Sequence, residues 1–225
     1  MLADIYERSA KAKGCTVVCG VDEVGRGPLA GPVVAAAVVV PWDTSIRAYL
    51  LERAGDSKVL TAKKREALAP YIHAHCTVSI AEASVAEIDA MNIRQATHLA
   101  MGRAVEGIER CSMFDGRLPN TREIQPHCLV DGNDMPNGLV GHTVVKGDAV
   151  ELAIACASIV AKVYRDTLMA ELDTAHPGYG WASNAGYGSA GHMEALQRLG
   201  ATVHHRTSFA PVREVVERDA QARAA

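Results

Sequence analysis

Residues 16–40, TVVCGVDEVGRGPLAGPVVAAAVVV, contain two apolar runs rich in β-branched side chains, one on each side of a glycine-rich segment. The runs cover residues 16–24 and 32–40, and their composition favours strands. The glycines and prolines of residues 25–31 favour a turn between them. We therefore expect two neighbouring strands to open the fold.

Three shorter apolar runs, at residues 76–82, 127–131 and 142–145, bring the expected number of strands to five. Apolar residues recur at helical spacing over residues 93–108, and residues 149–172 form an alanine-rich run without Gly or Pro. Both stretches are expected to be helices. This order of elements predicts an α/β fold with a mixed five-stranded sheet flanked by helices.

The chain has the length and the apolar content of one domain. Its 225 residues are 48% hydrophobic, which is enough to bury a full core, and no internal repeat or linker marks a second domain. We expect a single domain over residues 1–225, with an α/β core at about residues 15–170. Residues 171–225 are expected to form a C-terminal helical extension, whose last helix opens at Pro211.

Charge and aromatic content limit the ways in which this chain could bind nucleic acid. The formal net charge is only −3, so any nucleic-acid contact must come from local basic clusters rather than from a global positive field. Aromatic residues make up 4% of the chain, which argues against a single-strand binder that stacks bases on aromatic side chains. A duplex partner is easier to accommodate.

The cysteines and the apolar runs indicate in which cellular compartment the protein is expected. The six cysteines form no C-x-x-C pair, and the first residues show no charged-then-apolar signal pattern. No apolar run reaches the roughly 18 residues needed to cross a bilayer. We expect a cytoplasmic protein with reduced thiols and no membrane association.

Acidic residues stand in or directly after apolar runs at three places. Asp22 and Glu23 lie inside the first expected strand, Asp131 ends the run at residues 127–131, and Asp148 stands at the start of the expected long helix. A charge in such a setting is costly unless it is paired, hydrated or bound to a metal. The repetition of this placement indicates a shared site.

Carboxylates at the ends of neighbouring strands can converge on one cation. Oxygen ligands of this kind suit Mg²⁺ or Mn²⁺ better than zinc. Successive side chains of a strand point to opposite faces, so Asp22 and Glu23 reach one metal only if the strand twists there, or else Glu23 contributes differently. For a single strand-end Asp, a turn or helix cap is an equally good interpretation. For the four residues together, a metal site is favoured.

The glycine-rich segment follows the acidic pair but matches no standard phosphate-binding loop. Gly31 is one residue late for the dinucleotide fingerprint, and no G-K-[ST] follows Gly25 and Gly27. A tight turn is the simpler interpretation. The position of the glycines, with Arg26 between Gly25 and Gly27, would nevertheless let the backbone approach a ligand closely.

Two other kinds of hydrolytic site find no support. The nine histidines show no zinc-type spacing, and most are expected to be surface or satisfied core residues. Ser57, Ser158 and Ser208 lack a nucleophile-elbow context, so a serine triad is not expected.

The motifs along the chain closely resemble those of the ribonuclease HII family, the type 2 ribonucleases H. The match spans roughly residues 17–212, and Val150, Glu151 and Leu152 are among its mild departures. The matching motifs are GVDEVGRGPLAGPV at residues 20–33, DSK at 56–58, ID at 88–89, NI at 92–93, VDGN at 130–133, KGDA at 146–149, ASIVAKV at 157–163, YGW at 179–181, GYG at 186–188 and HRTSFAPV at 205–212.

The resemblance implies a ribonuclease H-like fold and an endonuclease that hydrolyses the RNA strand of RNA–DNA hybrids. It also implies nicking on the 5′ side of single ribonucleotides in duplex DNA by two Mg²⁺ or Mn²⁺ ions, giving 3′-hydroxyl and 5′-phosphate ends. Such an enzyme would serve ribonucleotide excision repair or RNA primer removal during DNA replication. The catalytic and metal-binding residues that it implies are Asp22, Glu23, Asp131 and Asp148.

The resemblance also implies residues that contact the substrate. Gly25, Arg26 and Gly27 would sense the ribose 2′-hydroxyl, the group that separates RNA from DNA, through their backbone. Tyr187 would pack on the adjacent sugar. Basic residues that could contact phosphates, or could equally be solvated charges, are Lys58, Lys162 and Arg206.

Two other functions remain open at this level. A noncatalytic hybrid-binding module of the same fold would bind without turnover, and the intact acidic residues count against it. Another nuclease of the superfold, such as an exonuclease or a resolvase-type enzyme, would share the metals but would give no reason for the glycine segment and Tyr187. We expect the protein to act as a monomer.

Overall fold

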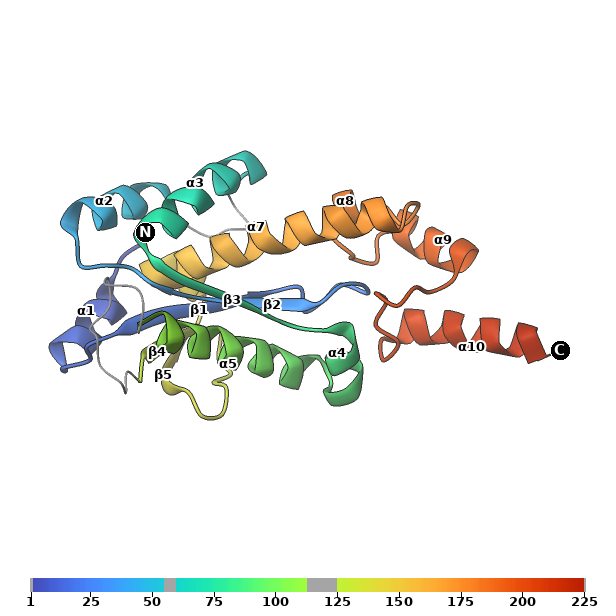
Figure 1. Cartoon of the computed structure of the whole chain (residues 1–225), viewed down its shortest axis with the longest axis horizontal. Coiled ribbons are helices and arrows are strands. Elements are labelled where there is room, and N and C mark those ends of the chain that lie inside the picture. The colour runs from blue at the N-terminus through green and yellow to red at the C-terminus, as the bar shows by residue number, and fades with distance from the viewer. Residues whose placement is uncertain (1, 55–59, 113–124, 225) are drawn as a thin grey trace. The chain divides into compact units, whose positions relative to one another are not determined.

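The computed structural model describes residues 2–54, 60–112 and 125–224. Figure 1 shows the ribbon and labels its elements. In chain order these are α1 (Ile5–Ala12), β1 (Val18–Val24), β2 (Val33–Val39), α2 (Thr44–Arg53), α3 (Ala62–His75), β3 (Thr77–Ala83), α4 (Val85–Met91), α5 (Ile93–Ser112), β4 (His127–Asp131), β5 (Val140–Val144), α6 (Gly147–Val150), α7 (Leu152–Ala175), α8 (Trp181–Asn184), α9 (Ala190–Leu199) and α10 (Ala210–Ala224).

The chain divides into two compact units. Unit 1 consists of residues 1–24, 34–82 and 98–163, and unit 2 consists of residues 25–33, 83–97 and 164–225. Neither unit is one continuous stretch of chain. The expectation of a single domain over residues 1–225 stays a prediction.

The described residues form a sheet of five strands, the number that the apolar runs predict, and the structure places them in the order β3-β2-β1-β4-β5. β1 pairs antiparallel with β2, and it pairs in parallel with β4 on its other side. β4 and β5 are also parallel. The sheet is therefore mixed, and β1 and β4 run side by side in the same direction.

Helices of unit 1 cover both faces of the sheet. In Figure 1, α2, α3 and the first part of α7 lie above the sheet and α5 lies below it. Every residue of β2 is buried, which explains its continuous apolar sequence. The core above β2 includes Val34 and Val38 of the strand, Leu50 of α2, Ile72 of α3 and Ile159 of α7.

The contact between α7 and β1 is unusually close. A Cβ atom added to Gly20 of β1 would stand 2.1 Å from the backbone carbon of Ala153 and 2.2 Å from the backbone nitrogen of Ile154. These are main-chain atoms that cannot rotate away. The absence of a side chain at Gly20 therefore sets the distance between helix and strand.

The long helix expected at residues 149–172 is interrupted. Glu151 adopts an extended conformation between α6 and α7, and Ala3 forms a parallel bridge with it. The Glu151 carboxylate accepts hydrogen bonds from the backbone amides of Tyr6 and Glu7, at 3.1 and 3.0 Å. The break thus attaches the start of α1 to this joint, a tertiary contact that overrides the helical preference of the local sequence.

A buried ion pair completes the attachment of α1. Arg47 of α2 donates to Glu7 and Asp4, both at 2.9 Å, and its side chain is only 4% exposed. The same guanidinium also donates to the carbonyls of Val40 and Pro41. Burial raises the pKa of Glu7, although the nearby Arg47 opposes that rise.

Unit 2 has its own small cores. Ala30, Met169, Tyr179, Trp181 and Ala195 form one buried cluster. A second cluster joins α9 and α10 to the glycine-rich segment, through residues that include Leu29, Leu196, Val212 and Val215. The C-terminal helices expected from the sequence are therefore present and packed.

None of the helices in the described part of the chain has both the length and the apolar character needed to cross a bilayer.

Candidate metal centre and substrate loop

Parallel pairing of β1 and β4 places two of the predicted acidic residues together. Val21 of β1 is in register with Val130 of β4. Asp22 and Asp131 are the next residues of the two strands, so they stand at the same end of neighbouring strands. The two apolar runs that carry Asp22 and Asp131 therefore bring these acidic residues to the same edge of the sheet.

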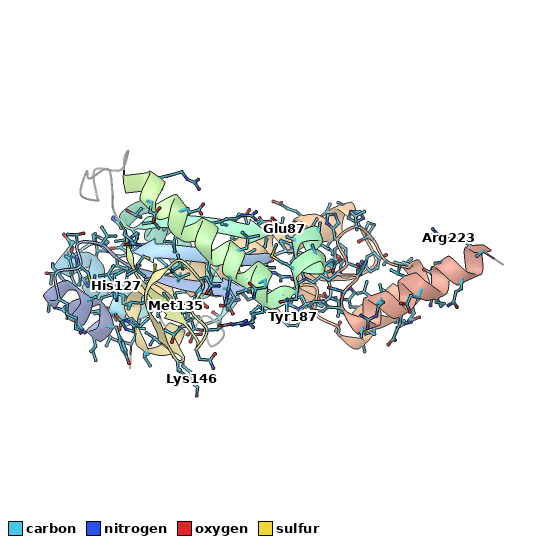
Figure 2. The ribbon with its side chains drawn as sticks, turned by 90° about the horizontal axis from the view of Figure 1, so that it is seen from below. Glu87, His127, Met135, Lys146, Tyr187 and Arg223 are labelled. Carbon is cyan, nitrogen blue, oxygen red and sulfur yellow. The ribbon has the colours of Figure 1, made fainter. Side chains whose placement is uncertain are left out.

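The turn before α6 brings in the third acid. Lys146 adopts a left-handed conformation, with φ at 56°, and its side chain extends away from the ribbon in Figure 2. The backbone amides of Gly147 and Asp148 then point at Asp131, whose Oδ1 accepts from them at 2.6 and 3.4 Å. This fixes Asp131 and places Asp148 beside it.

Asp22, Asp131 and Asp148 form a compact group of carboxylates. One oxygen from each lies within 4.8 Å of the others, and Asp22 and Asp148 are buried. Three negative charges at this spacing repel each other strongly unless a cation lies among them. An all-oxygen donor set of this kind fits a hard divalent cation such as Mg²⁺ or Mn²⁺.

The environment of Asp22 favours its protonated form when no cation is present. Burial raises the pKa of Asp22 well above its usual value, and the neighbouring Glu23 and Asp131 carboxylates raise it further. Hydrogen bonds from the Ser158 side chain and the Glu23 amide oppose this rise. A bound cation would reverse the balance by stabilising the carboxylate.

Glu23 does not belong to the compact group of three acids. Its backbone amide donates to Asp22 Oδ1 at 2.7 Å, and both residues pair regularly with β2, Asp22 with Ala36 and Glu23 with Ala35. With β1 regular at this point, adjacent side chains face opposite ways. Its role as a metal ligand stays a prediction.

Ser158 is a site residue to which the sequence alone assigned no role. It lies on α7, is almost fully buried and hydrogen-bonds the Asp22 carboxyl. The motif ASIVAKV contains this serine, but a hydroxyl within an apolar run does not by itself indicate which residue it contacts. Lys162 follows one turn later on α7 and is half-buried, whereas Lys58 lies outside the described residues.

The loop formed by Gly25, Arg26 and Gly27 belongs to unit 2. Gly25 has a φ of 94°, and Arg26 and Gly27 are exposed. A Cβ atom on Gly27 would lie 3.3 Å from Cε1 of Tyr187, so the Tyr187 ring stands directly against the loop. Tyr187, labelled in Figure 2, remains 50% exposed. The structure thus brings these four predicted substrate residues together.

Arg206 is neither exposed nor a solvated charge. Its side chain is fully buried, and it donates to the carbonyls of Gly25, Arg26 and Gly31 at 2.6, 2.9 and 2.9 Å. Burial, followed by the nearby Arg165 guanidinium, lowers the pKa of Arg206. The solvated-charge interpretation is therefore wrong for this residue, and the expected phosphate contact stays a prediction that its burial does not favour.

A chain of histidines holds the backbone at Tyr187. His192 Nδ1 is 2.9 Å from the Tyr187 carbonyl, and Trp181 Nε1 donates to His192 Nε2 at 3.0 Å. The Thr202 amide donates to His205 Nδ1, so the proton of His205 is on Nε2, which points at His192 Nε2 at 3.2 Å. Both imidazoles are neutral in this arrangement, as expected for satisfied core histidines.

Comparison with known proteins identifies the family of this chain. A model of the family described as Ribonuclease HII matches residues 19–212. The chain belongs to the ribonuclease HII family. It is accordingly a nuclease, an enzyme that hydrolyses phosphodiester bonds, and its fold is ribonuclease H-like.

Similarity to individual proteins supports this family assignment. A ribonuclease HII of Cereibacter sphaeroides is 52% identical over 218 residues, which cover 96% of this chain and 94% of the relative. The crystal structure of ribonuclease H2 from Pyrococcus horikoshii OT3 has a TM-score of 0.64 and 25% identity, covering 89% of this chain and 97% of that one. The resemblance proposed from the motifs is thereby confirmed.

A more distant likeness concerns the fold alone. The structure of Bst-RNase HIII in complex with Mn²⁺ has a TM-score of 0.67 at 18% identity, covering 93% of this chain and 73% of that one. The mixed sheet with flanking helices is therefore shared beyond the ribonuclease HII family.

Proposed function

We propose that this ribonuclease HII family member hydrolyses the RNA strand of RNA–DNA hybrids and nicks duplex DNA on the 5′ side of single embedded ribonucleotides. The observation that carries the proposal is the convergence of Asp22, Asp131 and Asp148 within 4.8 Å. The loop of Gly25, Arg26 and Gly27 with Tyr187 supports a substrate that is recognised at a ribose. Removal of misincorporated ribonucleotides and of RNA primers would be the corresponding roles in the cell.

The chain's own residues would prepare the site for two Mg²⁺ or Mn²⁺ ions. When bound, such ions activate a water for in-line attack on the phosphate and stabilise the leaving 3′ oxygen, which leaves 3′-hydroxyl and 5′-phosphate ends. Asp131 is held by two backbone amides and Asp22 by Ser158. These bonds fix the carboxylates before a cation arrives. Glu23 is the fourth proposed ligand.

A nicking assay tests the proposal directly. The substrate is a DNA duplex with one ribonucleotide, compared with the all-DNA duplex of the same sequence in Mg²⁺ or Mn²⁺. We expect a nick on the 5′ side of the ribonucleotide, and no nick in the all-DNA control. Binding without turnover would instead indicate a noncatalytic hybrid-binding module, and cleavage from the strand ends would indicate an exonuclease.

Variants of the acids connect the activity to the site. Asp22→Asn and Asp131→Asn are expected to abolish measurable cleavage and to retain binding of the hybrid, because metal coordination is lost rather than affinity. Asp134→Asn is the matched control, since Asp134 follows β4, pairs with His98 and is not one of the three converging acids. Substantial turnover by both Asp22→Asn and Asp131→Asn would mean that other residues hold the metal.

A further inference from the structure

Two buried arginines fix the glycine-rich segment of unit 2, and they hold different parts of it. Arg206 donates to the carbonyls of Gly25, Arg26 and Gly31. Arg165 donates to the carbonyls of Ala30, Pro32 and Ala185, at 3.1, 3.2 and 2.9 Å. Of these two side chains, Arg206 is the one that bonds the two peptide groups joining Gly25, Arg26 and Gly27.

The bonds to Arg206 determine which way these two peptide groups face. The described residues contain no cis peptide bond, and in a trans peptide the N–H points opposite to the C=O. Because the Gly25 and Arg26 carbonyls point at the buried guanidinium, the N–H groups of Arg26 and Gly27 point away from it. Arg26 and Gly27 are exposed, so this is the side of the loop that a ligand can approach.

The loop is also tied to the segment that carries Tyr187. The Leu29 amide donates to the Gly186 carbonyl at 2.8 Å, and the Arg206 amide donates to the Leu29 carbonyl at 2.9 Å. The Tyr187 ring then stands against Gly27, as described above. The amides and the ring are consequently parts of one hydrogen-bonded piece within unit 2.

We infer that Arg206 is a positioning residue that sets the polarity of this loop, so that the loop offers N–H donors to the ribose 2′ oxygen. Without the guanidinium, either peptide group could rotate and offer its carbonyl instead. A 2′-hydroxyl would still bind such a loop, but with altered geometry. The inference rests on the proposed function, because it assigns the loop to ribose recognition, and it gives Arg206 a task other than phosphate contact.

The test compares two lysine variants of buried arginines. Arg206→Lys keeps the charge but lacks the forked donors needed for three carbonyls. Arg165→Lys is the matched control, because it removes a guanidinium of the same unit that also packs against Gly25 but bonds other carbonyls. Dissociation constants are measured without divalent cation for the duplex with one ribonucleotide and for its all-DNA counterpart, and melting temperatures are recorded for both variants.

The ratio of the two dissociation constants is the deciding quantity. Arg206→Lys is expected to lower the preference for the ribonucleotide duplex by about tenfold, the upper range for the loss of one hydrogen bond between neutral groups. Arg165→Lys is expected to keep the wild-type ratio at a similar loss of melting temperature. An unchanged ratio in Arg206→Lys, while the wild-type protein still nicks the ribonucleotide duplex, overturns the inference and leaves the proposed function standing.

A second measurement needs no variant and so does not depend on whether Arg206→Lys folds. In ¹⁵N-labelled wild-type protein, the amide signals of Arg26 and Gly27 are expected to shift to higher proton frequency with the ribonucleotide duplex and to shift less with the all-DNA duplex. Equal shifts with the two duplexes would contradict an amide contact with the 2′ oxygen. Failure of the wild-type nicking assay would instead overturn the proposed function itself.

Discussion

Asp22 shows how a single residue can be prepared for a cation. It is buried next to Glu23 and Asp131, and this setting raises the pKa of Asp22 well above its usual value. In the metal-free protein the carboxyl therefore holds a proton at pH values where an exposed aspartate would be ionised. A cation and a proton compete for the same oxygen atoms.

We predict that binding of Mn²⁺ releases a proton from Asp22 and weakens as the pH falls. Because the pKa of Asp22 is raised in the metal-free protein, a larger fraction of Asp22 is protonated as the pH falls, and the cation must displace that proton. Calorimetry in two buffers of different ionisation enthalpy measures the number of protons released. A wild-type binding enthalpy that is the same in both buffers would contradict the prediction.

Tyr187 offers a second prediction for one residue. The ring stands against Gly27 and is half exposed, so it can contact a ligand held by the loop. Tyr187→Ala should reduce cleavage at a single ribonucleotide more than cleavage of a long hybrid, because the long hybrid has other contacts that position the scissile bond. Tyr187→Phe is the matched control and should cleave both. Equal losses on the two substrates would argue against this role.

At the scale of elements, the joint between α6 and α7 holds the N-terminal helix. The break at Glu151 supplies a bridge partner for Ala3 and a carboxylate for the first amides of α1, and Arg47 adds the buried pairs with Asp4 and Glu7. The attachment of α1 thus depends on polar contacts that are shielded from water.

Removal of Arg47 of α2 should loosen α1 far more than removal of Arg53, an exposed arginine that also lies on α2. Arg47→Met is expected to cost about 3–5 kcal/mol of unfolding free energy, because Glu7 would stay buried without a cation and Asp4 would keep only its pair with the exposed Arg8. Arg53→Met is the matched control: it breaks a pair with Glu52 in which both side chains are exposed, which is worth less than about 1 kcal/mol. Urea unfolding of the two variants measures the difference, and equal midpoints would contradict it.

Much of the fold follows from local patterns, and the exceptions are long-range contacts. The strands β1, β2 and β4 lie where apolar runs predict them, because a buried strand needs a continuous apolar sequence. The break at Glu151 could not be predicted, since the amides that its carboxylate binds lie 144 and 145 residues away. The alanine-rich sequence around it favours helix throughout.

The candidate site likewise contains residues that the sequence could predict and residues that it could not. Asp22 and Asp131 could be singled out because a charge at the end of an apolar run needs an explanation. The burial of Arg206 could not, because a segment rich in polar residues is normally exposed. Its carbonyl partners lie 175 to 181 residues earlier, and only the folded chain brings them together.

At the scale of the whole molecule, buried titratable groups make the two units sensitive to opposite changes of pH. In unit 2, burial, followed by the neighbouring His192, His204 and His176, lowers the pKa of His205 to about 3. In unit 1, burial raises the pKa of Glu151 to about 7, in spite of hydrogen bonds that lower it. The His205 imidazole therefore resists protonation, and the Glu151 carboxyl resists ionisation.

The sign of each effect follows from linkage. A histidine with a lowered pKa destabilises the fold as the pH falls from the ordinary value of 6.5 toward 3. A glutamate with a raised pKa destabilises the fold as the pH rises from the ordinary value of 4.5 through about 7. Unit 2 should therefore lose stability as the pH falls below about 6.5, and the attachment of α1 should weaken as the pH rises from about 4.5 to about 7.

Hydrogen exchange at several pH values, corrected for intrinsic rates, checks both expectations. Amides of α9 should lose protection as the pH falls from about 6.5 toward 3, and amides of α1 should lose protection as the pH rises from about 4.5 to about 7. Glu151→Gln carries no titrating proton and should remove the loss of protection in α1 as the pH rises. The reverse order of the two regions, or protection that is independent of pH, would contradict the assignment.

The close approach of α7 to Gly20 has a practical consequence for genetics. A methyl group at Gly20 would have to occupy the space of the Ala153 and Ile154 backbone, so Gly20→Ala should yield a chain that is degraded in cells and leaves no protein. Asp131→Asn should instead yield a stable protein that still binds its substrate. Alleles of these two kinds would separate the phenotype of a missing enzyme from that of an inactive one bound to nucleic acid, and the second could be dominant over the wild-type gene.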